Sequence, residues 1–206
     1  MRCKECKAKF EPVNFLQKFC KGSNDCLAAE ALYNLNKIKE KQLKDWNKEK
    51  PQRKIKAYSS RFKKELENNI NKLSKMIDKS FGHTTCIDCS NKMDLVHAAH
   101  FHNVSGNENI RYHLDNIHSA RAYCNQYSSE HKVGYRTGLE NRYGKDYLDY
   151  VKDELPLKYD HLGLKSNEIH DALQTVRKLI KNFDTYKFKD ARHARTMCNK
   201  IISIYK

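Results

Sequence analysis

The chain has 206 residues and a formal net charge of +15, from 40 Lys and Arg against 25 Asp and Glu. A balance this basic is typical of proteins that bind a polyanion, most often nucleic acid, with an anionic membrane surface as the alternative. The sequence shows no apolar run near the ~18 residues that span a bilayer, and the first six residues are charged and cysteine-bearing, unlike a signal peptide. These features exclude a membrane-spanning protein and predict a cytoplasmic one.

Hydrophobic residues make up 39% of the chain, which is low for one compact globule. We therefore expect small folded modules joined by exposed helix and stapled by metal ions. Cysteines in a cytosolic protein are more often metal ligands than disulfides, and seven of the eight fall into two groups. These are Cys3, Cys6, Cys20 and Cys26 in the first group and Cys86, Cys89 and Cys124 in the second. The remaining one, Cys198, is predicted to be a small buried apolar residue.

The first module is predicted to cover residues 1–26. Its four cysteines have the spacing of a structural zinc site, because four thiolates complete a tetrahedron and leave no open position for catalysis. The segment 27–80 that follows is rich in Lys and Arg. It is predicted to form two helices, near 27–49 and 52–80, broken at Pro51 because proline disfavours helix in the residue before it.

An apolar stripe runs along the second of these helices at steps of three or four residues. The stripe either packs on the chain's own modules or forms the seam of a homodimer. Its residues are Ile55, Tyr58, Phe62, Leu66, Ile70, Leu73 and Ile77.

Residues 81–142 are predicted to form the central module. A CxxC knuckle is followed by a strand of alternating character, a glycine-containing loop and a helix that begins near Asn125. Knuckle, hairpin and short helix make the layout of a treble-clef zinc site, in which the ion ties hairpin to helix. This layout would bring His100, Asn116 and Asn125 together.

Residues 143–206 are predicted to be helical. Together with the segment before them they carry helical patterns near 130–142, 145–155, 167–183 and 190–205, interrupted at Gly144, Pro156 and Gly163. The predicted fold class is therefore α+β and mostly helical. It comprises an N-terminal zinc-ribbon or knuckle module, long basic helices, a central treble-clef ββα module and C-terminal helices.

With its CxxC, His, Asn and Cys-Asn spacing, the central module resembles the HNH (ββα-metal) nuclease superfamily. More narrowly, the chain is similar over roughly residues 1–155 to the phage NinG (Rap) recombination endonucleases. The stretches that carry the resemblance are Cys86-Ile-x-Cys89, Ala99-His100-Phe101, Asn116-Ile117-His118, Tyr123-Cys124-Asn125-Gln126 and Tyr135-Arg136-x-x-Leu139.

The resemblance implies metal-dependent hydrolysis of a phosphodiester, with His100 as the general base. Asn116 would brace the loop and orient that base. Asn125 would bind a catalytic divalent ion, Mg²⁺ or Mn²⁺, and no organic cofactor is expected. His97 stands where the superfamily often has an acidic ligand and is a second candidate, although imidazole suits Mn²⁺ or Zn²⁺ better than Mg²⁺.

The same resemblance implies a second structural zinc site at Cys86, Cys89 and Cys124. Arg121 occupies the position where the family has a fourth cysteine. His118 is a candidate for the fourth ligand, and a three-cysteine site or a site without zinc is the alternative.

Branched recombination intermediates, such as Holliday junctions and D-loops, are the substrates that the resemblance implies. A homodimer would present two active sites to opposed strands in the cytoplasm of the host cell. Two alternatives stay open: a non-catalytic zinc-bearing DNA-binding recombination protein with a decayed HNH site, and a less selective HNH nicking nuclease. The residues predicted to contact DNA phosphates are Lys54, Lys56, Arg61, Lys63, Lys64, Arg121 and Arg136.

Overall fold

The computed structural model describes residues 1–57, 59–93, 95–127 and 131–205, and the side chains of Gln52, Lys56, Ala57, Tyr127, His131 and Lys132 lie outside the description. The chain divides into two compact units, Met1–Lys54 and Ile55–Lys206. It is mostly helical with a small two-stranded sheet, as the α+β prediction expects. Among the described residues, no helix is long and apolar enough to cross a membrane. The predicted division into four domains stays a prediction.

The first unit consists of the N-terminal cysteine module and most of helix α1, Asn24–Ala57. The module has a small core in which the rings of Phe19 and Tyr33 lie 5.6 Å apart. Helix α1 continues through Pro51, so the helix break predicted at this proline is wrong. Pro51 is exposed, so the carbonyl that loses its partner can bond to water, and the neighbouring Lys, Glu, Gln and Arg residues favour helix.

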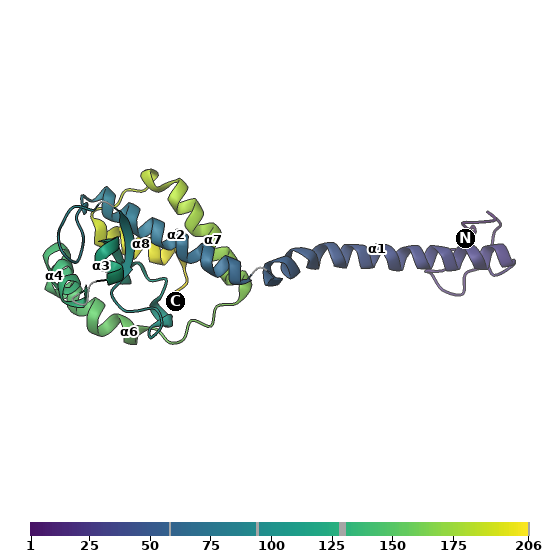
Figure 1. Cartoon of the computed structure of the whole chain (residues 1–206). Helices are drawn as coiled ribbons and strands as arrows, with labels where there is room; N and C mark the ends of the chain where they lie inside the picture. Colours follow the sequence, from purple (N-terminus) through teal and green to yellow (C-terminus); the bar gives the residue numbers. More distant parts are fainter. Residues whose placement is uncertain (58, 94, 128–130, 206) are drawn as a thin grey trace. The chain divides into compact units, whose positions relative to one another are not determined.

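In the second unit, helix α2, Ser59–Ser80, buries its apolar stripe. The stripe packs on α7, Ser166–Lys181, and on α8, Ala191–Ile202, and α7 lies alongside α2 (Figure 1). Each buried Leu or Ile contributes about 1.5–3 kcal/mol to folding. From Phe62 to Ile77 the stripe therefore packs on the chain's own helices and is not available as a dimer seam. Ile55 belongs to α1, and Tyr58 lies outside the described residues. The fully buried members are Leu66, Ile70, Leu73 and Ile77.

The sheet is an antiparallel hairpin of β1, Val96–His100, and β2, Ile117–Arg121. Its two faces belong to different apolar clusters. Ala98 and Ile117 face the cluster around α2, α7 and α8. Ala99 and Ala120 face a second cluster, which includes residues of α4, α5 and α6. The alternation predicted for the strand at 96–102 is thus present, although the strand ends at His100.

The remaining elements follow the sequence prediction closely. Between the strands lie two 3-10 turns, η1 and η2, and β2 leads directly into α3, which begins at Ala122 rather than near Asn125. Gly144, with φ of 89°, separates α4 from α5 as predicted. The interruption predicted at Pro156 is wrong, because α6 follows the π-helical turn η3 without a break. The Val151 carbonyl, five residues before this proline, accepts from His102 Nε2 at 2.8 Å instead. The bounds are η1 Glu108–Ile110, η2 Leu114–Asn116, α3 Ala122–Tyr127, α4 His131–Tyr143, α5 Lys145–Asp149, the π-helical turn η3 Tyr150–Glu154, α6 Leu155–Lys158 and the 3-10 turn η4 Phe183–Thr185.

A fully buried ion pair joins the C-terminal helices to the hairpin. Arg195 of α8 donates to Asp78 Oδ1 of α2 at 2.6 Å and to the Ile117 carbonyl at 2.7 Å. Asp78 also accepts from the backbone N–H of Ser119 at 2.7 Å. Burial alone would raise the pKa of Asp78, but the Arg195 guanidinium holds it well below its usual range. The C-terminal segment therefore forms part of the core that supports β2.

Candidate active site

Both cysteine modules contain a knuckle with the same backbone hydrogen bonds. In each, the N–H of the first cysteine, Cys3 or Cys86, donates to the carbonyl five residues later, at 2.9 and 2.8 Å. The residue after the second cysteine donates back to the first cysteine's carbonyl, at 3.1 and 3.0 Å. These residues, Lys7 and Ser90, have positive φ values of 60° and 59°. The tight turn brings the two thiols of each CxxC close together.

The sulfur positions fit tetrahedral zinc. Within each group all the sulfurs lie within 4.8 Å of one another. In the first group the Cys3 and Cys26 sulfurs are 3.8 Å apart, and a Zn–S bond of about 2.3 Å implies roughly this separation. Both groups could therefore hold a structural metal ion. The groups are Cys3, Cys6, Cys20 and Cys26, and Cys86, Cys89 and Cys124.

The structure does not bring His118 to the central thiols. Its ring is fully buried, and Nδ1 lies 3.1 Å from the Tyr135 hydroxyl. A strand rises about 3.3 Å per residue, so His118 is roughly 10 Å along β2 from Arg121, whose N–H donates to Cys86 Sγ at 3.2 Å. Within the described part of the chain, the central cluster contains three cysteines and no other Cys, His, Asp or Glu.

Arg121 lies at this cluster instead of a fourth cysteine. Burial would raise the pKa of the Cys89 thiol, but hydrogen bonds from the Asn91 backbone, the neighbouring thiols and the Arg121 side chain lower it. A guanidinium beside thiolates offsets their negative charge. Arg121 therefore belongs to the cysteine site, and its contact with DNA stays a prediction.

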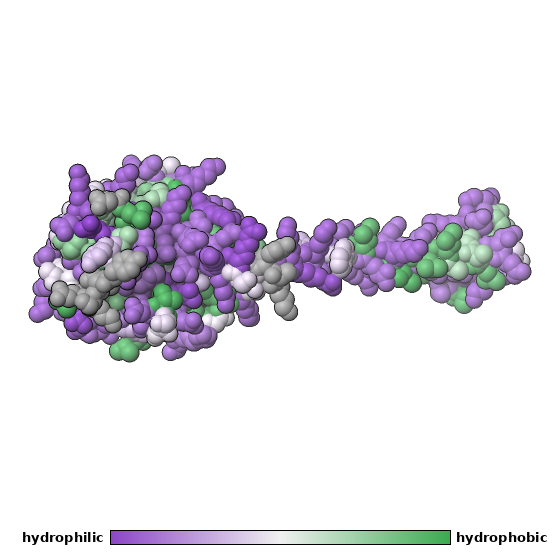
Figure 2. All heavy atoms as spheres, viewed as in Figure 1, coloured by the Kyte–Doolittle hydropathy of each residue, from purple (hydrophilic) through white to green (hydrophobic). Residues whose placement is uncertain are grey.

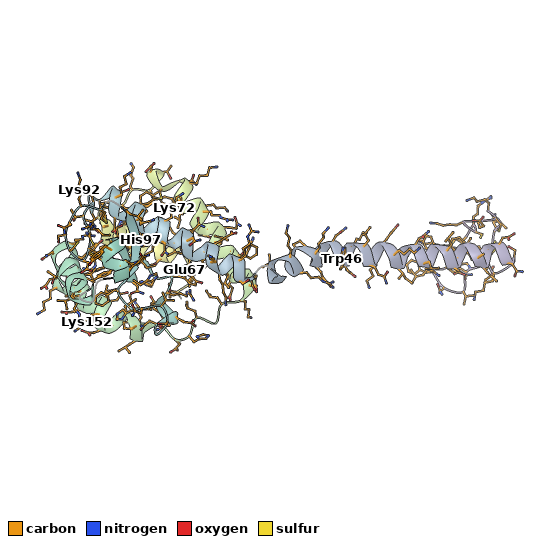
Figure 3. All side chains as sticks on the ribbon, viewed as in Figure 1. Trp46, Glu67, Lys72, Lys92, His97 and Lys152 are labelled. Atoms are coloured by element: carbon orange, nitrogen blue, oxygen red, sulfur yellow. The ribbon has the colours of Figure 1, made fainter. Side chains whose placement is uncertain are left out.

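His100 lies at the end of β1, opposite Ile117 on the adjacent strand. It is half-buried, and its Nε2 is 3.2 Å from the carbonyl oxygen of Arg111. Only a protonated Nε2 can bond to a carbonyl, which leaves Nδ1 as the unprotonated nitrogen. Burial lowers the pKa of His100, opposed by the bond to Arg111 and by Glu67 of α2, which Figure 3 labels. The ring is therefore neutral near pH 7, as a general base must be.

Asn116 clamps the chain just beyond His100. Its side chain is fully buried, and its Oδ1 accepts from the backbone N–H of His102 at 2.8 Å while its Nδ2 donates to the carbonyl of the same residue at 3.2 Å. The Asn116 carbonyl also accepts from the N–H of Phe101 at 2.9 Å. Three hydrogen bonds thus fix the two residues after His100.

Asn125 and His97 lie elsewhere on the same hairpin and helix. Helix α3, which carries Asn125, contacts both strands. Cys124 of α3 and Ala99 of β1 belong to the same buried cluster. His97 lies on the same face of β1 as Ala99. His100 lies on the opposite face. Among the described residues, no hydrogen bond directly joins the side chains of His100, Asn116 and Asn125. The hydrogen bonds of His100 and Asn116 place these two residues at one end of the hairpin.

The predicted phosphate contacts are mostly exposed, as such contacts require. Arg61 is engaged by Glu65 at 2.8 Å, and the side chain of Lys56 lies outside the described residues. The exposed members are Lys54, Arg61, Lys63, Lys64 and Arg136.

A lysine-lined groove beside β1 was missed from the sequence. Lys72, Lys75 and Lys79 of α2 line a groove of about 450 Å³ that also reaches Val96 of β1, and Figure 3 labels Lys72. The Lys75 ammonium donates to the Val96 carbonyl at 3.4 Å. The three lysines are spaced by three and four residues on one helix face, a signal visible in the sequence next to the apolar stripe.

A family model described as the bacteriophage lambda NinG protein matches residues 1–185. The chain belongs to the NinG family. The match includes every predicted site residue and both cysteine groups, whereas α8 with Arg195 lies beyond its end. No curated protein matches the chain, and no solved structure does.

Proposed function

We propose that this protein is a metal-dependent, structure-selective DNA endonuclease of the HNH type that cleaves branched recombination intermediates such as Holliday junctions and D-loops. The observation that carries the proposal is the ββα unit, in which His100 ends β1, Asn116 clamps the residues behind it, and α3 with Asn125 follows β2. Membership of the NinG family supports a phage protein of recombination that acts in the host cytoplasm. The net charge of +15 supports a nucleic-acid partner.

Phosphodiester hydrolysis needs an activated water and neutralisation of the charge that builds up at phosphorus. His100 supplies the base through Nδ1, because Nε2 is held by the Arg111 carbonyl. Asn125, with His97 as the second candidate, would hold a divalent ion. A bound Mg²⁺ or Mn²⁺ would polarise the scissile phosphate and stabilise the leaving oxygen. The exposed cations and the lysine groove would hold neighbouring phosphates without reading bases.

Cleavage of a labelled four-way junction, a D-loop and plain duplex, each with Mg²⁺, Mn²⁺ or no divalent ion, tests the proposal. Loss of a general base typically slows catalysis by about 10²–10⁴-fold. We expect this loss in His100→Ala, with DNA binding and zinc content retained. The matched control is His161→Ala, which removes an exposed histidine of the loop between α6 and α7.

Each alternative gives a different result in the same assay. Cleavage by His100→Ala at the wild-type rate would exclude His100 as the general base. Equal cleavage of duplex and junction would support the less selective nicking nuclease. Tight binding of junctions without cleavage under any ion would support the non-catalytic protein.

Zinc content is tested separately by metal analysis of the purified protein. We expect two zinc ions per chain, one lost in Cys3→Ser and the other in Cys86→Ser. A single ion that only Cys3→Ser removes would show that the three central cysteines do not retain zinc.

The homodimer in this proposal needs a surface other than the stripe on α2. Helix α1 has one, because apolar side chains are exposed along it (Figure 2), including Trp46, labelled in Figure 3. They recur at intervals of about eleven residues, three helical turns, so they share one side of the helix. They are Leu27 and Ile38, Leu32 and Leu43, and Leu35 and Trp46, with exposed fractions of 43–62%. We propose that two copies pair through this side of α1.

Sedimentation of the full chain tests the pairing. Wild type is expected to sediment as a dimer, and Leu35→Glu combined with Ile38→Glu as a monomer. Lys44→Glu, on the opposite side of α1, is the control and should remain dimeric. A monomeric wild type, or a dimer that survives the double substitution, would exclude pairing through α1.

A further inference from the structure

The second unit has an aromatic pocket with a basic rim, separate from the hairpin site. It has a volume of about 360 Å³ and is formed by η2, η3, the end of α6 with the residue after it, helix α8 and the segment after α8. We call it the tyrosine pocket and define it by Tyr150, Tyr159, Tyr205, Lys158, Arg192 and Lys200. Neither the resemblance nor the proposed cleavage mechanism uses these residues.

The tyrosine rings are arranged around the hollow. The ring centroids of Tyr159 and Tyr205 are 4.7 Å apart, and the Tyr205 ring is 4.8 Å from that of His113. The ammonium of Lys158 lies 5.6 Å from the centre of the Tyr150 ring and 5.7 Å from that of Tyr159. Tyr150 and Tyr159 are only half-buried, so part of each ring remains accessible for stacking.

The imidazole and the phenol rings of the pocket are uncharged near pH 7. Burial lowers the pKa of His113 to about 4 and raises the pKa of the Tyr150 and Tyr205 phenols, so the imidazole and both hydroxyls are uncharged. The carboxylate at the floor, Asp115, is buried and accepts a hydrogen bond from the Tyr147 hydroxyl at 2.9 Å.

The rim is positive. Lys158, Arg192 and Lys200 are all exposed at its edge. Arg192 is paired with Asp146 at 2.6 Å, while Lys158 is held by ring contacts. Uncharged aromatic rings below a cationic rim suit a ligand with a flat uncharged ring and an attached anion.

We propose that the tyrosine pocket binds one unstacked nucleobase of a DNA strand and that the rim holds the phosphate next to it. The proposal rests on the proposed function in that the strand belongs to branched DNA. A volume of 360 Å³ is at the small end of the range for ligand pockets, about 300–1,000 Å³, and admits a single nucleotide but no duplex. Base stacking on an aromatic side chain contributes about 1–3 kcal/mol and is tolerant of sequence, because every base has a π-face.

Two further observations give the pocket a role in choosing a substrate. Bases at a branch are already unstacked or easily unstacked, so a pocket for one base favours branched DNA over duplex. The pocket also includes His113 and Asp115, and His113 caps the 3-10 turn that ends at Asn116. A base held in the pocket therefore contacts the same turn that braces the residues after His100. The α8 side of the pocket lies beyond the residues that the NinG model matches.

The test uses the full-length, zinc-containing protein without Mg²⁺ or Mn²⁺, so that binding is measured apart from cleavage. The probe is a three-way DNA branch with one unpaired 2-aminopurine at the branch point, whose fluorescence falls on stacking. We expect quenching by wild type and by Tyr159→Phe. Tyr159→Ala should lose the quenching and bind the branch about 5- to 150-fold more weakly, with blunt-duplex affinity unchanged.

Two variants guard against misfolding and non-specific effects. Tyr186→Ala removes an exposed tyrosine outside the pocket and should behave as wild type. Lys158→Gln changes an exposed rim residue and should weaken branch binding without altering the fold. Wild-type quenching and affinity in both Tyr159→Ala and Lys158→Gln would overturn the proposal.

A free nucleotide is the other source of the same chemistry. Deoxyadenosine monophosphate is therefore added as a competitor, and relief of quenching at excess nucleotide supports a base-binding pocket. The assignment to a DNA strand would be overturned if Tyr159→Ala lost binding of the mononucleotide but kept wild-type binding of the branch. A protein that stacks the probe but cuts nothing would refute the nuclease proposal alone, and a junction-cutting protein without quenching would refute the pocket alone.

Discussion

Helix α4 docks on the second cysteine knuckle through two glycines. A Cβ added at Gly138 would overlap the carbonyl oxygen of Ile87, and a Cβ at Gly134 would lie 2.6 Å from the carbonyl oxygen of Asp88. Both carbonyls belong to the residues between Cys86 and Cys89. Because a backbone carbonyl within the tight CxxC turn cannot rotate away, Gly138→Ala is expected to push α4 off the knuckle.

The expected loss of stability in Gly138→Ala depends on the overpacking itself and on the buried side chains of α4. Overpacking of a tight contact costs about 1–3 kcal/mol, and alanine returns up to about 1 kcal/mol through its higher helix propensity. The displaced turn also carries Tyr135 and Leu139, both fully buried, and the Tyr135 hydroxyl donates to the Ala99 carbonyl at 2.9 Å. Full exposure of such a side chain costs about 1.5–3 kcal/mol, and partial exposure costs a fraction of this. We expect a net loss on the order of 3 kcal/mol in the free energy of unfolding.

Urea unfolding and the rate of zinc release to a thiol reagent measure the effect. Gly138→Ala should unfold at lower urea and release the zinc ion proposed for the central cysteines faster. Gly106→Ala is the control, because a Cβ there has nothing within 4 Å. If Gly138→Ala matched the control in both measurements, the close packing of α4 on the knuckle would be refuted.

Three other substitutions probe separate features. Ser90 has a φ of 59°, so Ser90→Gly should raise the free energy of unfolding by about 1 kcal/mol in urea titrations, and a lower value would contradict the turn. Arg195→Met leaves Asp78 buried without its partner and should cost about 3–5 kcal/mol in the same titrations, with Asp78→Asn added to it recovering part of the loss. Burial lowers the pKa of His113 in the folded protein to about 4, below its unfolded value. The free energy of unfolding is therefore unaffected by this group above pH ~6.5 and falls by roughly 3 kcal/mol as the pH drops to 4. The melting temperature of His113→Gln should vary less over this pH range than that of wild type.

Much of the local structure follows from the sequence. Apolar periodicity located the helices of the C-terminal half, and strand alternation separated Ala99 from His100 on opposite faces of β1. Cysteine spacing gave both sulfur groups, because a CxxC turn has little conformational choice. These features depend on residues a few positions apart, where periodicity and turn geometry act.

The sequence carries no comparable signal for contacts between residues that are far apart along the chain. The stripe on α2 shows that one side of the helix is buried, but its spacing does not distinguish α7 from a second copy of the chain. The pairing of Asp78 with Arg195 joins two charged residues that look like surface residues when read alone. The break predicted at Pro51 follows from the general tendency of proline to end a helix. Helix α1 continues through this proline, because the site is exposed and the residues around it favour helix.

The ion pair between Asp78 and Arg195 also sets an order of events during synthesis. The two residues are 117 positions apart, and the ribosome makes the hairpin long before it makes α8. Until Arg195 has emerged, Asp78 lacks its guanidinium partner and the inner face of β2 lacks part of its cover. A growing chain therefore carries an unfinished hairpin, and the candidate active site is completed only late in translation.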